Sequence, residues 1–334
     1  MNVETSTATD VEETQVVSKV LVLEPDGSCG LKIRDFCQAC NLHPLRAGED
    51  NLLGVLASNV DLGGVMIPER LGASGTAGIE LGRRIHALRP ELPIFLRRHL
   101  APALEGISQA DRRCFAGGYT IDSINTLRPL LDEFIFSMIY PNRLLRGIHD
   151  MTRTSVSSQF RELDLSIEAP YIVRDRVIFG EIFTLIPLET TWCRGYMTLQ
   201  TEESSLQGIV RAGRTYLDIR EADDFRSLNS VLGEVTNLIW GAFKNRYSDQ
   251  GGARSGSTAQ VPIIVNHLHR YISFGSGNPQ LCFKATLSDR ANPNLPVMTI
   301  LQRFVFNLNW SPEDFRENEV NVDSLVDSGE LELF

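Results

Sequence analysis

Apolar runs and helical patterns alternate through the first 138 residues. The predicted strands are 19–23, 61–67, 93–96 and, with a weaker pattern, 114–119. The predicted helices are 30–41, 76–88 and 124–136. The strand runs are short and almost continuously apolar, as in strands that are covered on both faces. Strand and helix in alternation with short connections predict an α/β domain with a doubly wound parallel sheet over residues 19–138.

From about residue 140 the pattern changes to two long helices among many strands. The predicted helices are 141–160 and 223–247. The predicted strands are 166–173, 176–186, 196–200, 261–265, 270–274, 281–287 and 298–308. Residues 248–260 are rich in glycine and serine, which predicts a flexible loop. Two long helices on a mostly antiparallel sheet predict an α+β domain over residues 139–312.

Length and charge add two acidic tails to this picture. A chain of 334 residues favours two domains, since single cores stop growing below this size. Residues 1–18 hold four acids and no base, and residues 313–334 hold eight acids and one base. These ends account for the net charge of −10, so the body is nearly neutral. We therefore expect two acidic tails, a disordered one over residues 1–18 and a second over residues 313–334 that is poorly ordered or loosely docked.

An arginine-rich stretch near the middle of the first half could indicate a nucleic-acid-binding face. Its members are Arg83, Arg84, Arg89, Arg97, Arg98, Arg112 and Arg113. Aromatic residues do not interleave with them and the body is neutral, so we expect a solvated face and no nucleic-acid partner. No apolar run approaches the length of a bilayer span, and no secretory signal opens the chain. The expected location is cytoplasmic, with no membrane partner.

The cysteines and histidines do not predict a metal or redox site. Cys37 and Cys40 form a CxxC, but they lie inside a predicted helix rather than at a strand-to-helix turn. His267 and His269 lack acids or cysteines at ligand spacing. All of these residues are therefore expected to be structural, with no bound metal.

Two segments of the first half carry a family resemblance. The sequence KVLVLEPDGS at 19–28 resembles the first strand and acid-pair turn of two-component receivers. The sequence GIELGRRIHALRPELPIFL at 78–96 resembles the third helix and fourth strand of a receiver. A decarboxylase wing domain of similar fold also fits these segments.

The groups that phosphorylate a receiver are missing. The reaction needs carboxylates to hold Mg²⁺, an aspartate nucleophile and a lysine. Glu24 and Pro25 stand at the acid pair, and Met66 or Gly64, depending on the register, stands at the nucleophile position. None of the four lysines lies where the fifth strand would end. We expect a degenerate receiver domain without phosphoacceptor or metal, used for packing or contacts.

The second long helix carries the candidate chemistry. Ser230, Glu234 and Asn237 follow one another at spacings of four and three, so they project from one helical face. Gly241, one turn further on, offers a smooth place for another backbone to approach. Pro262 follows the glycine- and serine-rich loop.

This arrangement resembles the signature of the CheC/CheX/FliY chemotaxis phosphatases. The signature is Ser or Asp, three residues, Glu, two residues and Asn, with a proline about two dozen residues later. The sequence GYMTLQTEESSLQGIV at 195–210 also resembles the strand-turn-helix that precedes the active helix of that family. The resemblance covers residues 140–310, and the first long helix has no such motif. One motif per chain is the CheX pattern.

The resemblance implies a phosphatase that acts on a phosphoaspartate of a partner receiver. Mg²⁺ and a lysine of the partner already hold that phosphoryl group, so the phosphatase needs no cofactor of its own. What hydrolysis lacks is a water held in line. Asn237 would hold this water, since a neutral carboxamide both donates and accepts hydrogen bonds. By the resemblance, Glu234 pairs with the partner's lysine, while Ser230, Trp240 and Gly241 form the docking surface.

Other readings of the same residues remain open. Glu234 can be a solvated residue, and Asn237 a polar residue with its hydrogen bonds satisfied. The chain can also be a signalling adaptor or dimerisation protein that docks receivers or kinases without catalysis. We also expect a homodimer through residues 139–312, because uncovered edge strands at 281–287 and 298–308 would pair with their own copies.

Overall fold

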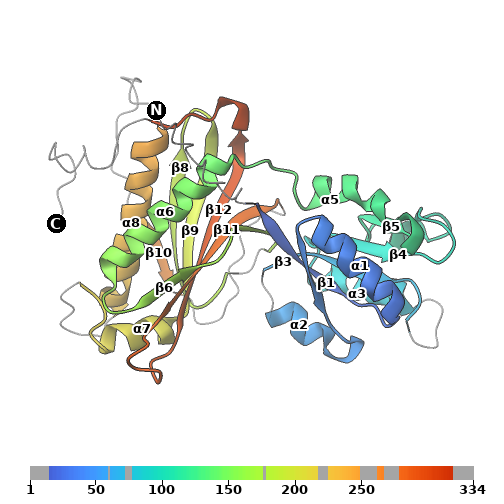
Figure 1. Cartoon of the computed structure of the whole chain (residues 1–334), viewed down its shortest axis with the longest axis horizontal. Coiled ribbons are helices and arrows are strands. Elements are labelled where there is room, and N and C mark those ends of the chain that lie inside the picture. Colours follow the sequence, from blue (N-terminus) through green and yellow to red (C-terminus); the bar gives the residue numbers. More distant parts are fainter. Residues whose placement is uncertain are drawn as a thin grey trace, which may run out of the picture.

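A computed structural model of the chain describes residues 15–58, 61–71, 77–175, 178–216, 225–248, 262–266 and 278–318. Among these residues, strands from both halves of the chain join in one mixed sheet of 12 strands, with helices packed on it (Figure 1). No helix within the described part of the chain is long and apolar enough to cross a bilayer.

The first half contributes five parallel strands. They are β1 (Val17–Val22), β2 (Leu42–Arg46), β3 (Leu62–Pro68), β4 (Ile94–Arg97) and β5 (Gly117–Tyr119). The helices are α1 (Gly27–Ala39), α2 (Leu52–Ser58), α3 (Ala77–Leu88), α4 (Gln109–Arg112) and α5 (Arg128–Phe134). The strands pair in the order β2-β1-β3-β4-β5, every pair parallel.

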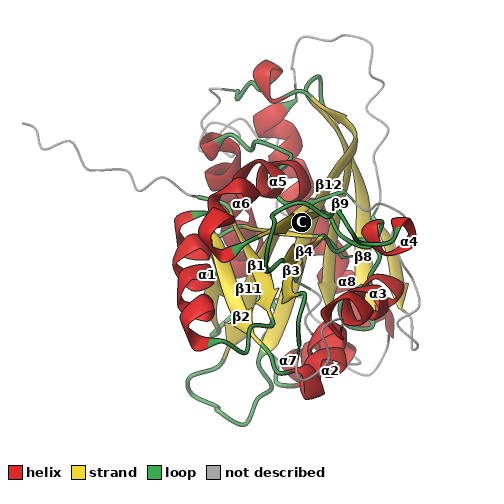
Figure 2. Ribbon diagram, turned by 90° about the vertical axis from the view of Figure 1, so that its right-hand side faces the viewer, coloured by secondary structure: helices red, strands yellow, loops and turns green. Residues whose placement is uncertain are grey.

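Helices cover both faces of these five strands (Figure 2). Val20 and Val22 of β1 pack in the cluster that includes residues of α1 and α5. Leu21 and Leu23 pack in the opposite cluster, with residues of α2 and α3. Because both faces are buried here, residues 20–23 are all apolar, which is why this part of the sequence reads as a continuous run.

The second half adds the antiparallel strands. They are β6 (Asp164–Ile167), β7 (Tyr171–Val173), β8 (Ile182–Glu189), β9 (Cys193–Thr201), β10 (Ile263–Asn266), β11 (Gln280–Ser288) and β12 (Met298–Trp310). The helices are α6 (Asn142–Gln159), α7 (Glu203–Arg211) and α8 (Phe225–Tyr247). The order is β10-β8-β9-β12-β11-β7, with β6 beside β11. The long helices α6 and α8 pack against each other over this sheet (Figure 1).

The short strand β7 joins the two sets of strands. It pairs parallel with the start of β1 and antiparallel with β11. The hydroxyl of Ser18 donates to the backbone oxygen of Ile172 at 2.8 Å. A Cβ on Gly63 of β3 would collide with that hydroxyl, so glycine permits the close approach of β1, β3 and β7.

Most expected elements are present, with changed bounds or divisions at several places; the expected strand 176–186, for example, is β8 at Ile182–Glu189. The segment 166–173 is two strands, β6 and β7, because both pair with β11 but at different positions along it. The segment 124–136 is a 3₁₀ turn (Ile121–Leu127) followed by α5, because Thr120 and Ser123 cap the turn reciprocally and Pro129 follows at a helix start. The short elements β2, α2 and α4 were not predicted from the sequence. The expected loop 248–260, apart from its first residue, and the expected strand 270–274 lie outside the described residues.

The prediction that segments 281–287 and 298–308 are uncovered edge strands is wrong. β12 lies between β9 and β11, and β11 lies between β12 and the strands β6 and β7. Each strand thus finds neighbours within the chain on both sides, and neither offers a free edge for a homodimer over its paired length.

The prediction that the arginine-rich stretch forms a solvated face is also partly wrong. Arg89 is buried, and Arg97 and Arg98 turn inward to the carboxylates of Glu24 and Glu69. A charge at such a depth requires a partner, and each of these arginines has one.

The boundaries of the expected tails move outward. Val17 and Ser18 belong to β1, because their backbones pair with β7. Near the other end, the carboxylate of Glu317 bridges Arg143 at the start of α6 and Arg246 at the end of α8. The segment that leads to Glu317 is therefore docked on the fold. The outer parts of both tails lie outside the described residues.

Candidate functional site

The helix α8 has one buried face and one outward face. Residues at helical spacing pack into the core; they are Leu228, Val231, Leu232, Val235, Ile239 and Phe243. Ser230 and Asn237 are exposed on the other side, and Glu234 is half-buried between them. At 3.6 residues per turn, spacings of four and three keep these three side chains on one stripe, which we call the α8 outer face.

Two contacts fix the rotation of α8 on the sheet. Thr236, fully buried, donates its hydroxyl hydrogen to the backbone oxygen of Leu232 at 2.7 Å. The hydroxyl of Thr184 in β8 lies 2.7 Å from that of Thr236 and is therefore the donor between the two. Gly233 faces Ile264 of β10 so closely that even a methyl group would press on it. With this side held against the sheet, Glu234 and Asn237 are left facing outward.

Glu234 and Asn237 share one property on this face. In the part of the chain that the structure describes, neither side chain has a hydrogen-bond or ion-pair partner. Ser230 differs, because its hydroxyl donates to the backbone oxygen of Arg226 at 2.8 Å. The carboxylate and the carboxamide are thus available to groups from outside the chain.

Near the C-terminus of α8, the α8 outer face has open space around Gly241 and is bordered by the aromatic ring of Trp240. A Cβ on Gly241 would meet nothing within 4 Å. Trp240 packs partly against the core, and the ammonium of Lys244 lies 5.2 Å from its ring centroid. Trp240 therefore borders the α8 outer face rather than standing at its centre.

Pro262 takes a structural position. It is buried immediately before β10, which pairs with β8 beside α8. The loop that leads to it from α8 lies outside the described residues.

A second group of polar residues lies where β1 and β4 end. The carboxylate of Glu24 accepts from Nε of Arg97 at 2.6 Å and from Nη2 at 2.9 Å, a bidentate pair. The backbone nitrogen of Asp26 donates to the same carboxylate at 3.1 Å. Burial lowers the pKa of Arg97, but the hydrogen bond and charge of Glu24 raise it further, so the net direction is upward. This end of the sheet holds an internal ion pair with both charges engaged.

The expected phosphoacceptor position offers no acceptor. Met66 is buried, with its sulfur 3.9 Å from that of Cys37 in α1. Gly64 is enclosed by Pro93 and Ile135. Neither the thioether of Met66 nor Gly64, which has no side chain, can accept a phosphoryl group. This holds whichever of the two occupies the nucleophile position.

The cysteines and the potential metal-ligating residues among the described positions form no redox or metal site. All six cysteines are free thiols, and burial raises the pKa of Cys37 to about 12. No group of histidine, cysteine, aspartate and glutamate among the described residues could hold a metal ion. His267 and His269 lie outside those residues.

Sequence reasoning missed two features of these sites. The Thr184–Thr236 pair joins residues of two elements, and no local pattern indicates it. Arg97 pairs with Glu24, but the two residues are 73 positions apart in the sequence. The only sequence signal for this pair is a carboxylate and an arginine, each at the end of a buried strand.

Comparison with known proteins gives partial likenesses. No protein-family model matches the sequence, and no curated protein matches it. The solved structure of the chemotaxis protein CheX of Vibrio vulnificus is 18% identical, with a TM-score of 0.32; the match covers 47% of this chain and 96% of that one. A chemotactic CheC-like protein of Shewanella oneidensis is 16% identical over 47% of this chain and 92% of that one, with a TM-score of 0.31. FliY of Thermotoga maritima is 13% identical over 51% and 94%, with a TM-score of 0.32. A function for this chain has to be argued from its own residues.

Proposed function

We propose that this chain is a phosphatase that hydrolyses the phosphoaspartate of a partner receiver protein, through the α8 outer face. One observation carries the proposal. Glu234 and Asn237 stand one turn apart on the outward side of a helix held rigidly against a sheet, and neither has a partner among the described residues. The motif and its spacing resemble the signature of the CheC/CheX/FliY phosphatases.

Asn237 is the group that acts on the reaction. Hydrolysis of an acyl phosphate needs little acid–base assistance and depends on a water held in line with the leaving oxygen. A carboxamide accepts a hydrogen bond from this water and donates another, and it carries no charge that would repel the phosphoryl group. Its exposure on α8 lets it enter the open active site of another protein.

Glu234 acts on the complex rather than on the water. It lies about 4.5 Å before Asn237 along the helix axis. A lysine in the partner's site would pair with this carboxylate, which sets the register of docking. Gly241, with open space around it, lets the backbone of the partner approach.

The first half is proposed to be a receiver-like domain without phosphorylation chemistry. Its parallel order β2-β1-β3-β4-β5 is that of flavodoxin-like sheets, the class to which receivers belong. The ion pair of Glu24 and Arg97 occupies the strand ends where a receiver binds Mg²⁺.

The test is the turnover of phosphorylated receivers. A set of receivers is charged with acetyl phosphate and Mg²⁺, the donor is removed, and phosphate release is followed with and without this protein. The proposal predicts that at least one receiver loses phosphate faster in catalytic proportions. Binding of a charged receiver without faster release would instead make the chain an adaptor.

A further inference from the structure

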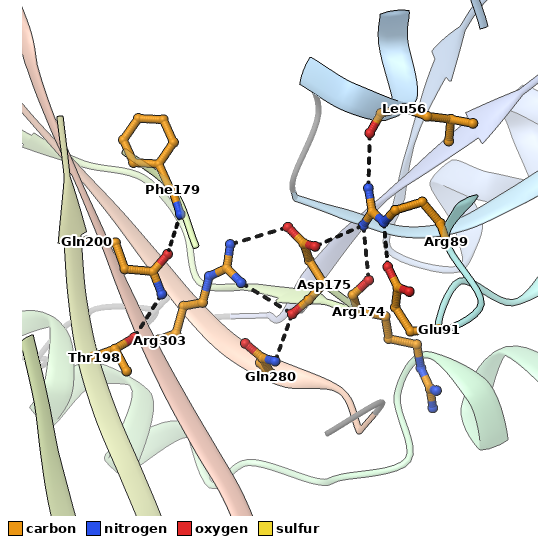
Figure 3. A network of polar contacts seen from close by, with 10 residues as sticks. All are labelled: Leu56, Arg89, Glu91, Arg174, Asp175, Phe179, Thr198, Gln200, Gln280 and Arg303. Atoms are coloured by element: carbon orange, nitrogen blue, oxygen red, sulfur yellow. Dashed lines mark hydrogen bonds and ion pairs between the residues drawn. The ribbon is translucent and has the colours of Figure 1, made fainter. Parts of the chain in front are cut away.

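Four charged side chains meet at the junction of the two halves (Figure 3). Arg89 and Glu91 come from the connection between α3 and β4 in the first half. Asp175 follows β7, and Arg303 lies in β12 of the second half. Each is at least nine-tenths buried, and Asp175 is only 1% exposed. We call these four residues the junction cluster.

Asp175 is the centre of the junction cluster. Its carboxylate lies 3.4 Å from Nη2 of Arg89 and 3.6 Å from Nη2 of Arg303. Its backbone oxygen accepts from Gln280 at 3.0 Å and from Arg303 at 3.4 Å. Asp175 thus contacts β11 through Gln280 and β12 through Arg303. It also contacts the first half through Arg89.

Arg89 makes the matching contacts from the first half. Its guanidinium pairs with Glu91, and Nη1 donates to the backbone oxygen of Leu56 at 3.0 Å. The Nη2 group donates to the backbone oxygen of Arg174 at 3.3 Å, next to its contact with Asp175. Arg89 therefore contacts both α2 and the residues that directly follow β7.

Arg89 and Asp175 would each lose one charged partner if the halves separated. Each half would keep one ion pair of its own, Arg89 with Glu91 and Asp175 with Arg303. A buried charge that loses part of its pairing is destabilised, because its desolvation is then less well compensated. Separating the halves would break the contacts of Arg89 to Asp175 and would open the strand pairing of β7 with β1. Neither half can open at the junction without that loss.

We infer that the junction cluster locks the two halves into one cooperatively folding unit. The first half is then a fixed part of the body that carries α8, not a module tethered by a mobile linker. This inference is independent of the proposed phosphatase activity, because it concerns how the halves are joined.

The chain contains buried thiols that can test this lock in both halves. Cys37 in α1 and Cys193 in β9 are completely buried, and burial raises the pKa of both thiols to about 12. Such thiols react with alkylating reagents only when their surroundings open. Labelling across a urea series, read residue by residue by peptide mass spectrometry, gives an unfolding midpoint for each half of the full chain.

The expected result for the wild type is one common midpoint for Cys37 and Cys193. Asp175→Asn should lower and separate the two midpoints. Asp289→Asn is the matched control, since this carboxylate is also buried and pairs with Arg214, but both lie in the second half. It should lower the stability and keep the midpoints together. Arg89→Gln, which keeps the pair of Asp175 and Arg303, is the second variant if Asp175→Asn does not fold.

Two outcomes overturn the inference. Different midpoints for Cys37 and Cys193 in the wild type would mean that the halves unfold independently. A common midpoint retained in both junction variants would mean that the shared sheet couples the halves without the cluster.

Discussion

Glu234 and Asn237 contribute differently at the residue scale, because one is charged and the other neutral. A carboxylate that pairs with a partner's lysine does so before and during the reaction. Glu234→Ala is therefore expected to weaken the complex with a phosphorylated receiver while the rate at saturation changes little. A charge-assisted hydrogen bond of about 1.5–3 kcal/mol corresponds to roughly ten- to a hundredfold in affinity. Titration with a phosphorylated receiver measures it; unchanged affinity would remove Glu234 from the contact.

The closed strand ends of the first half make a second prediction at this scale. Met66 and Gly64 are buried and Glu24 is bound to Arg97, so neither residue at the expected phosphoacceptor position offers a nucleophile. Incubation with acetyl phosphate and Mg²⁺ should leave the intact mass unchanged. An aspartyl adduct mapped to the first 138 residues would contradict this, and a charged active receiver serves as the positive control.

Single residues differ in how far the sequence reveals them. The stripe of Ser230, Glu234 and Asn237 could be predicted, because the helical period alone decides which residues share a face. The pairing of Glu24 with Arg97 could not. It depends on which strands become neighbours, and that choice is made by contacts far apart along the chain.

At the scale of elements, the hydroxyl pair of Thr184 and Thr236 holds α8 on β8. Thr236→Val leaves the buried hydroxyl of Thr184 without its acceptor, at a cost of about 1–3 kcal/mol. Thr184→Val/Thr236→Val removes both polar groups and should recover most of that loss. Urea denaturation of the single and double variants decides this. A double variant as unstable as the single one would mean that packing, not the hydrogen bond, sets the cost.

The helix α1 carries a pH-dependent cap. The hydroxyl of Ser28, with the backbone amides of Ser28 and Cys29, lowers the pKa of Asp26 to about 2. A lowered pKa means that the carboxylate stabilises the fold at neutral pH and that this stabilisation is lost as the pH falls through about 2. Asp26→Asn keeps a capping oxygen that does not titrate. The stability difference between wild type and variant should shrink as the pH falls from 5 to 2; a constant difference would contradict it.

Elements also show where local patterns fail. The long helices α6 and α8 and the strands β11 and β12 were predictable, because their apolar periods are long. The short strand β2 was not predicted, and β7 was predicted as one strand together with β6. A strand of three residues such as β7 is defined by its hydrogen-bonding partners on both sides rather than by its own side chains.

On the scale of the whole molecule, the sequence pointed to two units and the structure joins their strands in one sheet. The change from parallel to antiparallel pairing was visible as a change of pattern near residue 140. The joining of β7 to β1 was not, because it needs Gly63 and the buried charges of Asp175 and Arg89 to meet from distant segments. Apolar periodicity carries no information about such polar contacts.

The most direct measurement is the turnover of a phosphorylated receiver by Asn237→Ala. A group that holds the attacking water acts mainly in the transition state, so kcat should fall by most of its value while KM stays near that of the wild type. Asn245→Ala is the matched control, an exposed asparagine further along α8, and should keep wild-type turnover. If Asn237→Ala retains the full kcat on a receiver that the wild type dephosphorylates, the α8 outer face is not the site of hydrolysis.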